Sequence, residues 1–579
     1  MNKLKSQQGI GLIVFFLTVL ASGAVFLLTT QTNDDNRISS ENSTSESLAL
    51  AKSALLSYAV NYYLGQSNTG ISHAGVHGLL PCPETQIVGT EGISSGNCAN
   101  RNSNSLGRLP WKTLDLPPLK DSSGECLWYA VSGGFFTSPS AFMTNADTPG
   151  MFQIYNEQAL LEKGDTPENR VVAIVIAPGT QLSGQSRPAV VPNSNLPCKI
   201  TRDSAVATDY LDNYQGINNS LVDTANADQV EQFIAANGLK INPNLNDRLI
   251  TITSDEIFNA IQKNAPIYAA KFGALGLALG QCLIEYADAA AAQLNAPAPG
   301  DDPVYDACME SCYADCDSDL NLCLLANTGP GQSDCKPPWA QCKQTCRKST
   351  CTTSGGNNGN NGNNGNNGNN GNNGNNGNNG GGGGTARPLL PWPAAIDLAG
   401  DYRIDANYAD LNNATNGHFG RLPNSTDNTQ AALGAGDTDI FANCSISTEM
   451  FTLWTNWKDH WFYVVGSDFS PSAVGTTLPS PCNNCPENSV NTKHAAILIF
   501  ADQRNINQLR RANDTEADPD VTPPNILDTK ATLSNYLEGN NLNNYSDPDG
   551  DKTYGLNNSN DRLFCINTDI DTVSECTPP

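Results

Sequence analysis

The chain repeats itself, and this internal repeat constrains the fold more than any other feature of its sequence. A series of short motifs occurs twice and in the same order, once before residue 254 and once after it. The matched stretches are 79–83 with 389–393, 107–110 with 420–423, 128–132 with 462–466, 138–140 with 470–472, 171–177 with 495–501, 210–211 with 536–537, 218–219 with 543–544, and 246–249 with 560–563. A collinear series of this length is not expected by chance, so the sequence predicts two copies of one domain.

Each copy is expected to begin with a helix. Residues 45–63 carry apolar side chains near helical spacing, and residues 254–293 repeat this pattern with acidic residues in the first turn. Pro-rich loops and short apolar runs, such as 128–132 and 170–177, follow the first helix. A helix packed on a small, mostly antiparallel sheet is an α+β fold, and this is the fold that the sequence predicts for both copies.

The repeated motifs have a structural interpretation that needs no catalysis. Proline fixes backbone angles, glycine permits unusual ones, and paired aromatic residues fill a core. The repeated arginines, Arg108 with Arg421 and Arg248 with Arg562, are expected to bridge carboxylates or backbone carbonyls.

An apolar run near the N-terminus extends from Ile10 to about Leu28, and we expect a transmembrane helix over 10–30. Lysines precede the run and aspartates follow it, so the positive-inside rule places the N-terminus in the cytoplasm and the body outside. A secretory signal peptide and an uncleaved signal anchor are the plain alternatives.

The composition agrees with a body outside the cytoplasm. The chain contains 18 cysteines, and disulfides persist in periplasmic or extracellular space. Its net charge is −26 and it has no sizeable basic patch, which excludes nucleic acid as an expected partner of the body.

The residues around the start of the apolar run resemble a type IV prepilin leader. Lys-Ser-Gln-Gln-Gly at 5–9 is followed directly by Ile-Gly-Leu-Ile at 10–13. This resemblance implies a leader over 1–9, cleavage between Gly9 and Ile10 by a prepilin peptidase, and methylation of the new N-terminus. It also implies residence in the bacterial inner membrane before assembly, and contact with other pilin-like subunits through the N-terminal helix.

One position departs from the pattern of the family. Its major subunits carry Glu at the fifth mature position, where this chain has Val14. Some minor subunits that cap filaments also lack this Glu, so the resemblance implies a minor pilin or pseudopilin-like subunit. The Leu-Pro-Cys-Pro and Gly-Arg-Leu-Pro-Trp elements, with the strand at 128–132, also look like those of bacterial pilin-like proteins. This resemblance is good across residues 80–250 and weaker across residues 389–570.

The predicted domains are 31–253 and 254–579, and the second is interrupted by a stretch foreign to the first copy. Residues 297–354 of this stretch hold eight cysteines spaced for one helical face, with a Gly-Pro-Gly turn between two groups of four. Two antiparallel helices would join these cysteines in nested order, although a metal cluster is a less favoured alternative. The expected pairs are Cys308–Cys351, Cys312–Cys346, Cys316–Cys342 and Cys323–Cys335.

Residues 355–386 follow as a Gly/Asn-rich linker of repeated Gly-Asn-Asn, which we expect to be flexible. The linker would let the cysteine hairpin project from the second copy. A contact module for an unknown surface or protein ligand and a neutral spacer are both compatible with this pattern.

The remaining candidates are a cation loop and further disulfides. Asp547, Asp549 and Asp551 alternate around a glycine turn, which makes calcium the one expected cofactor, with a solvated turn as the alternative. Cys82 and Cys98 bracket a Gly/Ser loop and are expected to pair, as are Cys126 with Cys198 and Cys565 with Cys576. Cys482 and Cys485 have redox-motif spacing, but we expect them to form structural disulfides with partners elsewhere.

The sequence therefore favours an interaction function without a reaction. It contains no nucleophile elbow, phosphate loop or His-Glu-x-x-His motif. We expect a minor subunit of a type IV pilus or type II secretion-like filament that acts in capping, assembly or surface adhesion. The alternatives are a membrane-anchored extracytoplasmic binding protein outside a filament, and a secreted-side hydrolase with no recognisable motif.

Overall fold

The computed structural model describes a large part of the chain in two compact units. The described residues are 38–62, 77–84, 91–95, 98, 104–136, 144–187, 198, 207–222, 230–237, 242–263, 265–294, 311–312, 314, 388–398, 402, 404–411, 417–426, 439–444, 446–473, 482–505, 507–511, 530–545, 552–555 and 560–576. Unit 1 includes the described residues up to Lys263, and unit 2 includes those from Ala265 onward. Within the described part, no single helix has the length and apolar character needed to cross a membrane, although α2 (Ser254–Lys263) and α3 (Ala265–Leu294) together pass that test by length and composition.

The boundary between the two units lies later than the sequence predicted. The expected single helix over 254–293 is divided into α2 and α3, because Pro266 follows closely after α2 and suits only the first turn of a new helix. Helix α2 belongs to unit 1, where it contacts β9 (Arg248–Thr253) and buries Ile257, Phe258 and Ile261. The predicted domain end at 253 is therefore corrected to Lys263.

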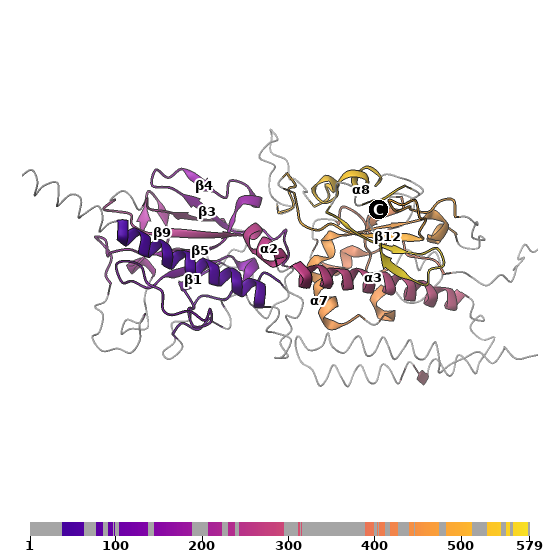
Figure 1. Ribbon diagram of the computed structural model, residues 1–579, viewed down its shortest axis with the longest axis horizontal. Helices are drawn as coiled ribbons and strands as arrows, with labels where there is room; N and C mark the ends of the chain where they lie inside the picture. The colour runs from indigo at the N-terminus through magenta and orange to yellow at the C-terminus, as the bar shows by residue number, and fades with distance from the viewer. Residues whose placement is uncertain are drawn as a thin grey trace, which may run out of the picture. The chain divides into compact units, whose positions relative to one another are not determined.

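Unit 1 places an N-terminal helix, residues 38–62, across a mixed sheet (Figure 1). Leu48, Ala51, Leu55 and Ala59 are buried and lie on one helical face, as the apolar spacing predicted. The antiparallel part of the sheet runs in the order β1 (Ser105–Arg108), β2 (Trp128–Val131), β5 (Val171–Ala177) and β9. All seven residues of β5 are buried, as expected for a strand covered on both faces.

Further strands extend and flank this sheet. Strand β3 (Phe152–Tyr155) is antiparallel to β4 (Leu161–Lys163) and to the first residue of β5, and it is parallel to β8 (Glu231–Ile234). The short strands β6 (Asn213–Tyr214) and β7 (Ile217–Asn218) form a separate hairpin.

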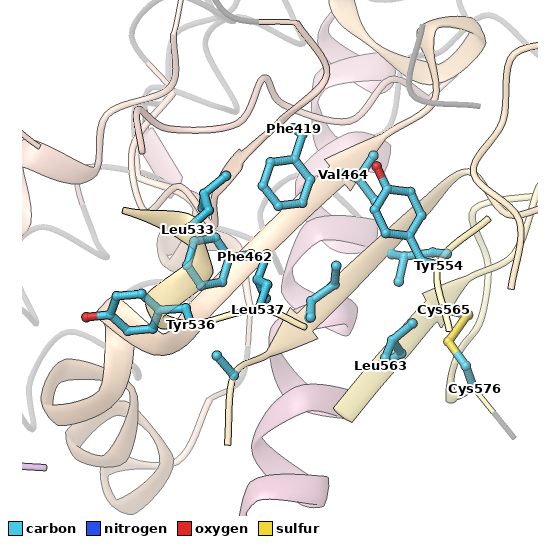
Figure 2. Close-up of a cluster of buried hydrophobic side chains, with 13 residues drawn as sticks. Phe419, Phe462, Val464, Leu533, Tyr536, Leu537, Tyr554, Leu563, Cys565 and Cys576 are labelled. Carbon is cyan, nitrogen blue, oxygen red and sulfur yellow. A yellow bond between two sulfur atoms is a disulfide. The ribbon is translucent and has the colours of Figure 1, made fainter. Parts of the chain in front are cut away.

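Unit 2 packs α3 on one face of a five-stranded antiparallel sheet. The strand order is β10 (Phe419–Arg421), β11 (Trp461–Val465), β12 (Ala496–Phe500), β13 (Arg562–Ile566) and β14 (Val573–Glu575). Helices α7 (Thr448–Trp457) and α8 (Gly539–Asn543) lie in the connections. Side chains on the sheet face opposite α3 form a buried core with Leu533, Tyr536 and Tyr554 (Figure 2).

The two sheets align residue by residue. Arg108 pairs with Trp128, which pairs with Ile176, which pairs with Leu249. In unit 2 the same positions are Arg421, Phe462, Ile499 and Leu563. The sequence matches at the two arginines, the two aromatics and the two leucines are thus confirmed as equivalent positions in the sheets. The match of 171–177 with 495–501 is wrong by one residue, because a run of similar apolar side chains carries no marker of register.

Three glycines let α3 approach its sheet closely. A β-carbon on Gly276 would collide with the Phe564 ring, and one on Gly280 would lie 2.5 Å from Val573 Cγ2. Gly273 faces the Arg562 guanidinium in the same way, at 2.8 Å. The glycines follow one another at helical spacing, so one stripe of α3 has no side chains where the strands pass.

Replacing Gly276 by Leu is expected to destabilise unit 2 by about 2 kcal/mol, because the added side chain has no space beside Phe564. Urea unfolding measures this loss. Ala270→Leu adds the same side chain at an exposed position of α3 and should change the free energy of unfolding by less than about 0.5 kcal/mol. Equal losses in the two variants would contradict close packing at the glycine stripe.

Candidate functional site: a polar cluster repeated in both units

An arginine at the end of the first strand of each antiparallel sheet is buried between aromatic rings. The Arg108 guanidinium lies 5.1 Å from the ring centroid of Trp128 and 4.8 Å from that of Tyr210. In unit 2 the guanidinium of Arg421 lies 4.8 Å from the Phe462 ring and 5.1 Å from the Tyr536 ring. A guanidinium stacks on such rings because it is planar and weakly hydrated.

Arg108 and Arg421 bind backbone carbonyls, as the sequence predicted. Arg248 and Arg562, the second repeated pair, bind carboxylates. Arg421 is fully buried and donates to the carbonyls of three separate loops. The acceptors are the carbonyl oxygens of Ile396 at 3.0 Å, Lys530 at 2.5 Å, and Asp459. Arg248 forms an ion pair with Glu41, and Arg562 forms one with Glu575 at 2.9 Å. The repeated arginines therefore tie loops and helices to the sheet.

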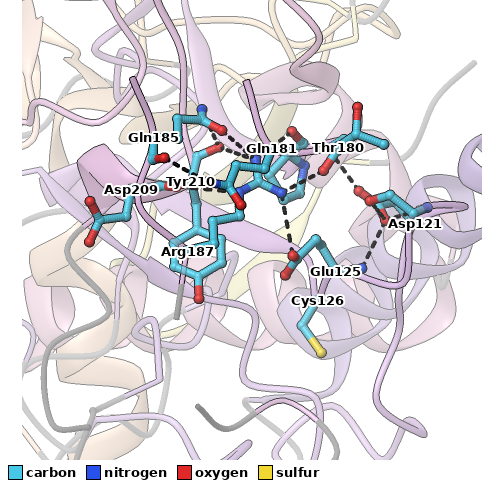
Figure 3. A network of polar contacts seen from close by, with 12 residues as sticks. Asp121, Glu125, Cys126, Thr180, Gln181, Gln185, Arg187, Asp209 and Tyr210 are labelled. Carbon is cyan, nitrogen blue, oxygen red and sulfur yellow. Dashed lines mark hydrogen bonds and ion pairs between the residues drawn. The ribbon is translucent and has the colours of Figure 1, made fainter. Parts of the chain in front are cut away.

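A second arginine, Arg187, forms hydrogen bonds with the loop that follows β5 and with the segment that contains Tyr210 (Figure 3). Its guanidinium donates to the carbonyls of four residues: Gly179 at 2.6 Å, Tyr210 at 3.0 Å, Pro178 at 3.2 Å and Asp209 at 3.3 Å. It also lies 3.4 Å from the Glu125 carboxylate. Gln185 Oε1 accepts from Arg187 at 2.9 Å and from the backbone N–H of Leu182 at 2.9 Å. The planar fork of the guanidinium can satisfy this many acceptors at once, whereas an ammonium cannot.

The same arrangement recurs in unit 2 around Arg510. Its guanidinium donates to the carbonyls of Asp502 at 2.8 Å, Tyr536 at 3.1 Å, and Asn535. Gln508 Oε1 accepts from Arg510 at 2.7 Å and from the Asn505 backbone N–H at 2.9 Å. We call each such pair, Gln185 with Arg187 and Gln508 with Arg510, a Gln-x-Arg clasp. The two clasps bind equivalent backbone positions in the two units.

Two carboxyl groups in unit 1 bind each other's backbone beside this clasp. The Asp212 N–H donates to Asp247 Oδ2 at 2.8 Å, and the Asp247 N–H donates to Asp212 Oδ2 at 2.9 Å. Asn219 donates to Asp247 Oδ2 at 2.8 Å and accepts from the Ile234 N–H at 2.8 Å. Gln185 links the pair to the clasp, because its side-chain amide donates to Asp212 at 2.9 Å.

Unit 2 contains the counterpart of this carboxyl pair. Asn541 donates to Asp561 Oδ2 at 2.9 Å and accepts from the Gly555 N–H at 3.0 Å. Glu538 takes the position of Asp212 and accepts from Gln508 at 2.7 Å. The buried arginine, the Gln-x-Arg pair and the bond between an asparagine and an aspartate are therefore repeated in both units.

Sequence comparison missed part of this cluster. It matched 218–219 with 543–544, but Asn541 has the role of Asn219. It also missed the Gln-x-Arg clasps, since only two letters are shared there. Their equal spacing is the signal that could have found them: Gln185 follows Ile176, and Gln508 follows Ile499, by the same interval.

Burial raises the pKa of Asp247 well above its usual range, and the nearby Asp212 carboxyl raises it further. The pKa of Asp212 is also raised, mainly by burial, although its backbone hydrogen bonds oppose the rise. A neutral Asp247 leaves no uncompensated charge in the core. The donors and acceptors described here bind the chain itself, so the cluster holds loops in place.

The disulfides near the sheets include three that the sequence predicted. Cys82 is joined to Cys98, Cys126 to Cys198, and Cys565 to Cys576. The last pair joins β13 to the residue after β14.

One further disulfide corrects the sequence interpretation, and another joins two cysteines for which no pairing was predicted from the sequence. Cys482 is bonded to Cys485 rather than to partners elsewhere. The Asp468 carboxylate lies 3.3 Å from Cys482 Sγ and accepts the N–H groups of Asn483 and Asn484 at 3.2 Å, so it supports this short loop. Cys282 of α3 is bonded to Cys444, which fixes α3 to the 3₁₀ turn Ile440–Asn443.

Several residues predicted as sites lie outside the described residues. These are the processing residues Gly9 and Ile10, the calcium candidates Asp547, Asp549 and Asp551, and seven of the eight hairpin cysteines, namely Cys308, Cys316, Cys323, Cys335, Cys342, Cys346 and Cys351. The eighth, Cys312, is disulfide-bonded. The nested pairing and the calcium loop stay predictions.

Comparison with known proteins found no matching family model, no matching curated protein and no matching solved structure.

The raised pKa of Asp247 predicts how stability depends on pH. A carboxyl whose pKa is higher in the folded state stabilises the fold fully below its unfolded pKa of about 3.9, and loses this contribution as pH rises through the folded pKa. Asp247→Asn keeps an acceptor for Asp212 and Asn219 but does not ionise. We expect the variant to lose less stability than the wild type as pH rises above about 4.

Urea unfolding from pH 4 to pH 8 measures this difference. Asp165→Asn changes an exposed aspartate in the same unit and should leave the pH profile of the wild type unchanged. Parallel profiles for wild type and Asp247→Asn would show that Asp247 does not titrate with folding.

Replacing Arg187 by Lys should destabilise unit 1 by about 2–3 kcal/mol, because the ammonium leaves several loop carbonyls unpaired. The matched change Arg248→Lys should cost less than about 1 kcal/mol, since a lysine can still pair with Glu41. Differential scanning calorimetry compares the two, and equal losses would argue against the clasp as a specific anchor.

Proposed function

We propose that the chain is a minor pilin or pseudopilin-like subunit of a type IV pilus or type II secretion-like filament, acting in filament capping or assembly or in surface adhesion. The observation that carries this proposal is the helix over 38–62, which packs its apolar face on a mostly antiparallel sheet. This helix begins shortly after the expected membrane segment over 10–30. An anchor that leads into a helix lying on a sheet is the arrangement that the prepilin-like leader implies.

The disulfides support a body outside the cytoplasm, in the periplasm or on the cell surface. Those joining Cys126 to Cys198 and Cys282 to Cys444 link residues far apart in sequence, and such bonds persist in oxidising compartments. The proposal therefore places the protein first in the inner membrane, with its two units outside, and then with other pilin-like subunits in a filament.

The proposed position in the filament is a minor one. Val14 stands where major subunits carry Glu, and unit 2 adds a second body of the same strand arrangement to the first. A membrane-anchored binding protein outside a filament shares the same anchor and the same units, so processing of the N-terminus separates the two functions.

The test is the mature N-terminus, determined by mass spectrometry in cells with and without prepilin peptidase. We expect N-methylated Ile10 only when the peptidase is present, because cleavage would fall after Gly9. Gly9→Val should leave Met1 in place, whereas the matched change Gly23→Val, within the apolar run, should leave processing intact. Intact Met1 in every strain would reject the filament subunit and leave the anchored binding protein.

A further inference from the structure

The disulfide between Cys482 and Cys485 closes the shortest loop among the disulfides whose two cysteines are both described. Its cysteines are 3 residues apart, whereas those of the other bonds are separated by 11, 16, 72 or 162 residues. A cross-link stabilises a fold mainly by restricting the unfolded chain, and a short loop restricts it least. Opening this bond should therefore destabilise the fold less than opening any of the other four.

The backbone of this loop is held by groups other than the disulfide. The Asp468 carboxylate accepts the N–H groups of Asn483 and Asn484 at 3.2 Å. On the carbonyl side, the Lys493 ammonium donates to the Cys482 carbonyl at 2.7 Å and to the Asn483 carbonyl at 3.3 Å. These bonds do not involve the sulfurs, so they keep the two thiols close enough to form the disulfide again after it has opened.

The loop also packs closely on the end of β11. Gly466 follows this strand, and a β-carbon there would lie 2.6 Å from the Asn484 carbonyl oxygen and 3.1 Å from Cys485 Cα. Cys485 is fully buried, whereas Cys482 is 7% exposed and the neighbouring Asn483 is exposed. Cys482 is therefore the member of the pair that is nearer to solvent.

The Asp468 carboxylate suits the reduced pair better than the oxidised one. Its Oδ2 atom lies 3.3 Å from Cys482 Sγ. A sulfur in a disulfide has no proton to donate, but a thiol at Cys482 could donate to this oxygen. Reduction therefore adds a hydrogen bond to a charged acceptor and leaves the two backbone bonds of Asp468 in place. A disulfide whose reduced form is stabilised in this way is more easily reduced.

We propose that Cys482 and Cys485 are a redox-active pair that undergoes thiol–disulfide exchange with an external dithiol. A thiolate of the dithiol attacks the sulfur of Cys482, the less buried cysteine, which forms a mixed disulfide and releases the Cys485 thiolate to take up a proton. The second sulfur of the dithiol then closes the dithiol's own disulfide and releases Cys482, which is protonated in turn. The pair gains two electrons and two protons, both supplied by the dithiol, which leaves as a disulfide.

The experiment equilibrates the purified full chain, in detergent, with mixtures of reduced and oxidised dithiothreitol. Acid stops the exchange, N-ethylmaleimide in denaturant labels the free thiols, and mass spectrometry of peptides identifies the cysteines that were reduced. We expect Cys482 and Cys485 to be half reduced at a ratio of reduced to oxidised dithiothreitol about tenfold or more below that of the other four described pairs.

Asp468→Asn keeps an oxygen for the backbone N–H groups but removes the charge to which a Cys482 thiol would donate. The ratio needed for half reduction should rise about threefold or more, because hydrogen bonds to charged acceptors are stronger than those to neutral ones. The matched change Asp569→Asn alters an exposed aspartate of the same unit and should leave the ratio unchanged.

A second comparison does not depend on the Asp468 variant. Replacing both Cys482 and Cys485 by serine should lower the unfolding midpoint of unit 2 by less than about 3 °C, because Asp468 and Lys493 still hold the loop. Replacing both Cys282 and Cys444 by serine should lower it by about 10 °C, because that bond closes a much longer loop. Differential scanning calorimetry measures both midpoints.

The proposal is overturned if Cys482 and Cys485 are reduced together with the other described pairs or after them. It is also overturned if Asp468→Asn leaves the ratio for half reduction unchanged or lowers it, or if the two double serine variants lose equal stability. None of these outcomes depends on whether the chain is processed or assembled, so the result is separate from that of the N-terminal experiment.

Discussion

Buried guanidinium groups stabilise each of the two units from within. Much of the described chain lies in loops, and loop backbone brought into a core must find hydrogen-bond partners. Arg421 satisfies carbonyls of three loops, and Arg510 and Arg187 each satisfy several more. The aromatic rings that stack on these groups shield them from water, which strengthens each hydrogen bond but makes the loss of any partner costly. The cluster therefore makes folding of the loops depend on folding of the sheet.

The sheet positions could be predicted because each repeated motif contains residues that only one environment suits. Gly107 and Gly420 illustrate this: a β-carbon at either position would collide with the crossing segment that carries Pro83 or Pro393. The α+β class and the apolar face of the first helix followed from similar local rules. Such rules act within a few residues, so a self-comparison detects them.

The clasps, the boundary at Lys263 and the Cys282–Cys444 bond could not be predicted in this way. A Gln-x-Arg pair forms a clasp only when a segment distant in the sequence supplies the carbonyl acceptors. The sequence alone does not show which distant segments lie together in the fold. A continuous helical pattern over 254–293 conceals that Ile257 and Phe258 pack in one unit and Phe272 in the other. Cys482 and Cys485 were assigned other partners although their spacing is that of a redox motif, and the loop supported by Asp468 instead allows them to bond to each other.

The two units share one cluster, and an aromatic residue from an equivalent segment covers the outer face of each sheet. In unit 1 this residue is Phe233 of β8, which pairs in parallel with β3. In unit 2 it is Tyr554, which lies beside the parallel bridge between Glu487 and Thr553 and stacks on Phe419. The glycine stripe and the Cys282–Cys444 bond hold α3 on the other face. The frame of sheet, cluster and aromatic cover is therefore common to both units, and it depends on contacts between segments that are far apart in the sequence.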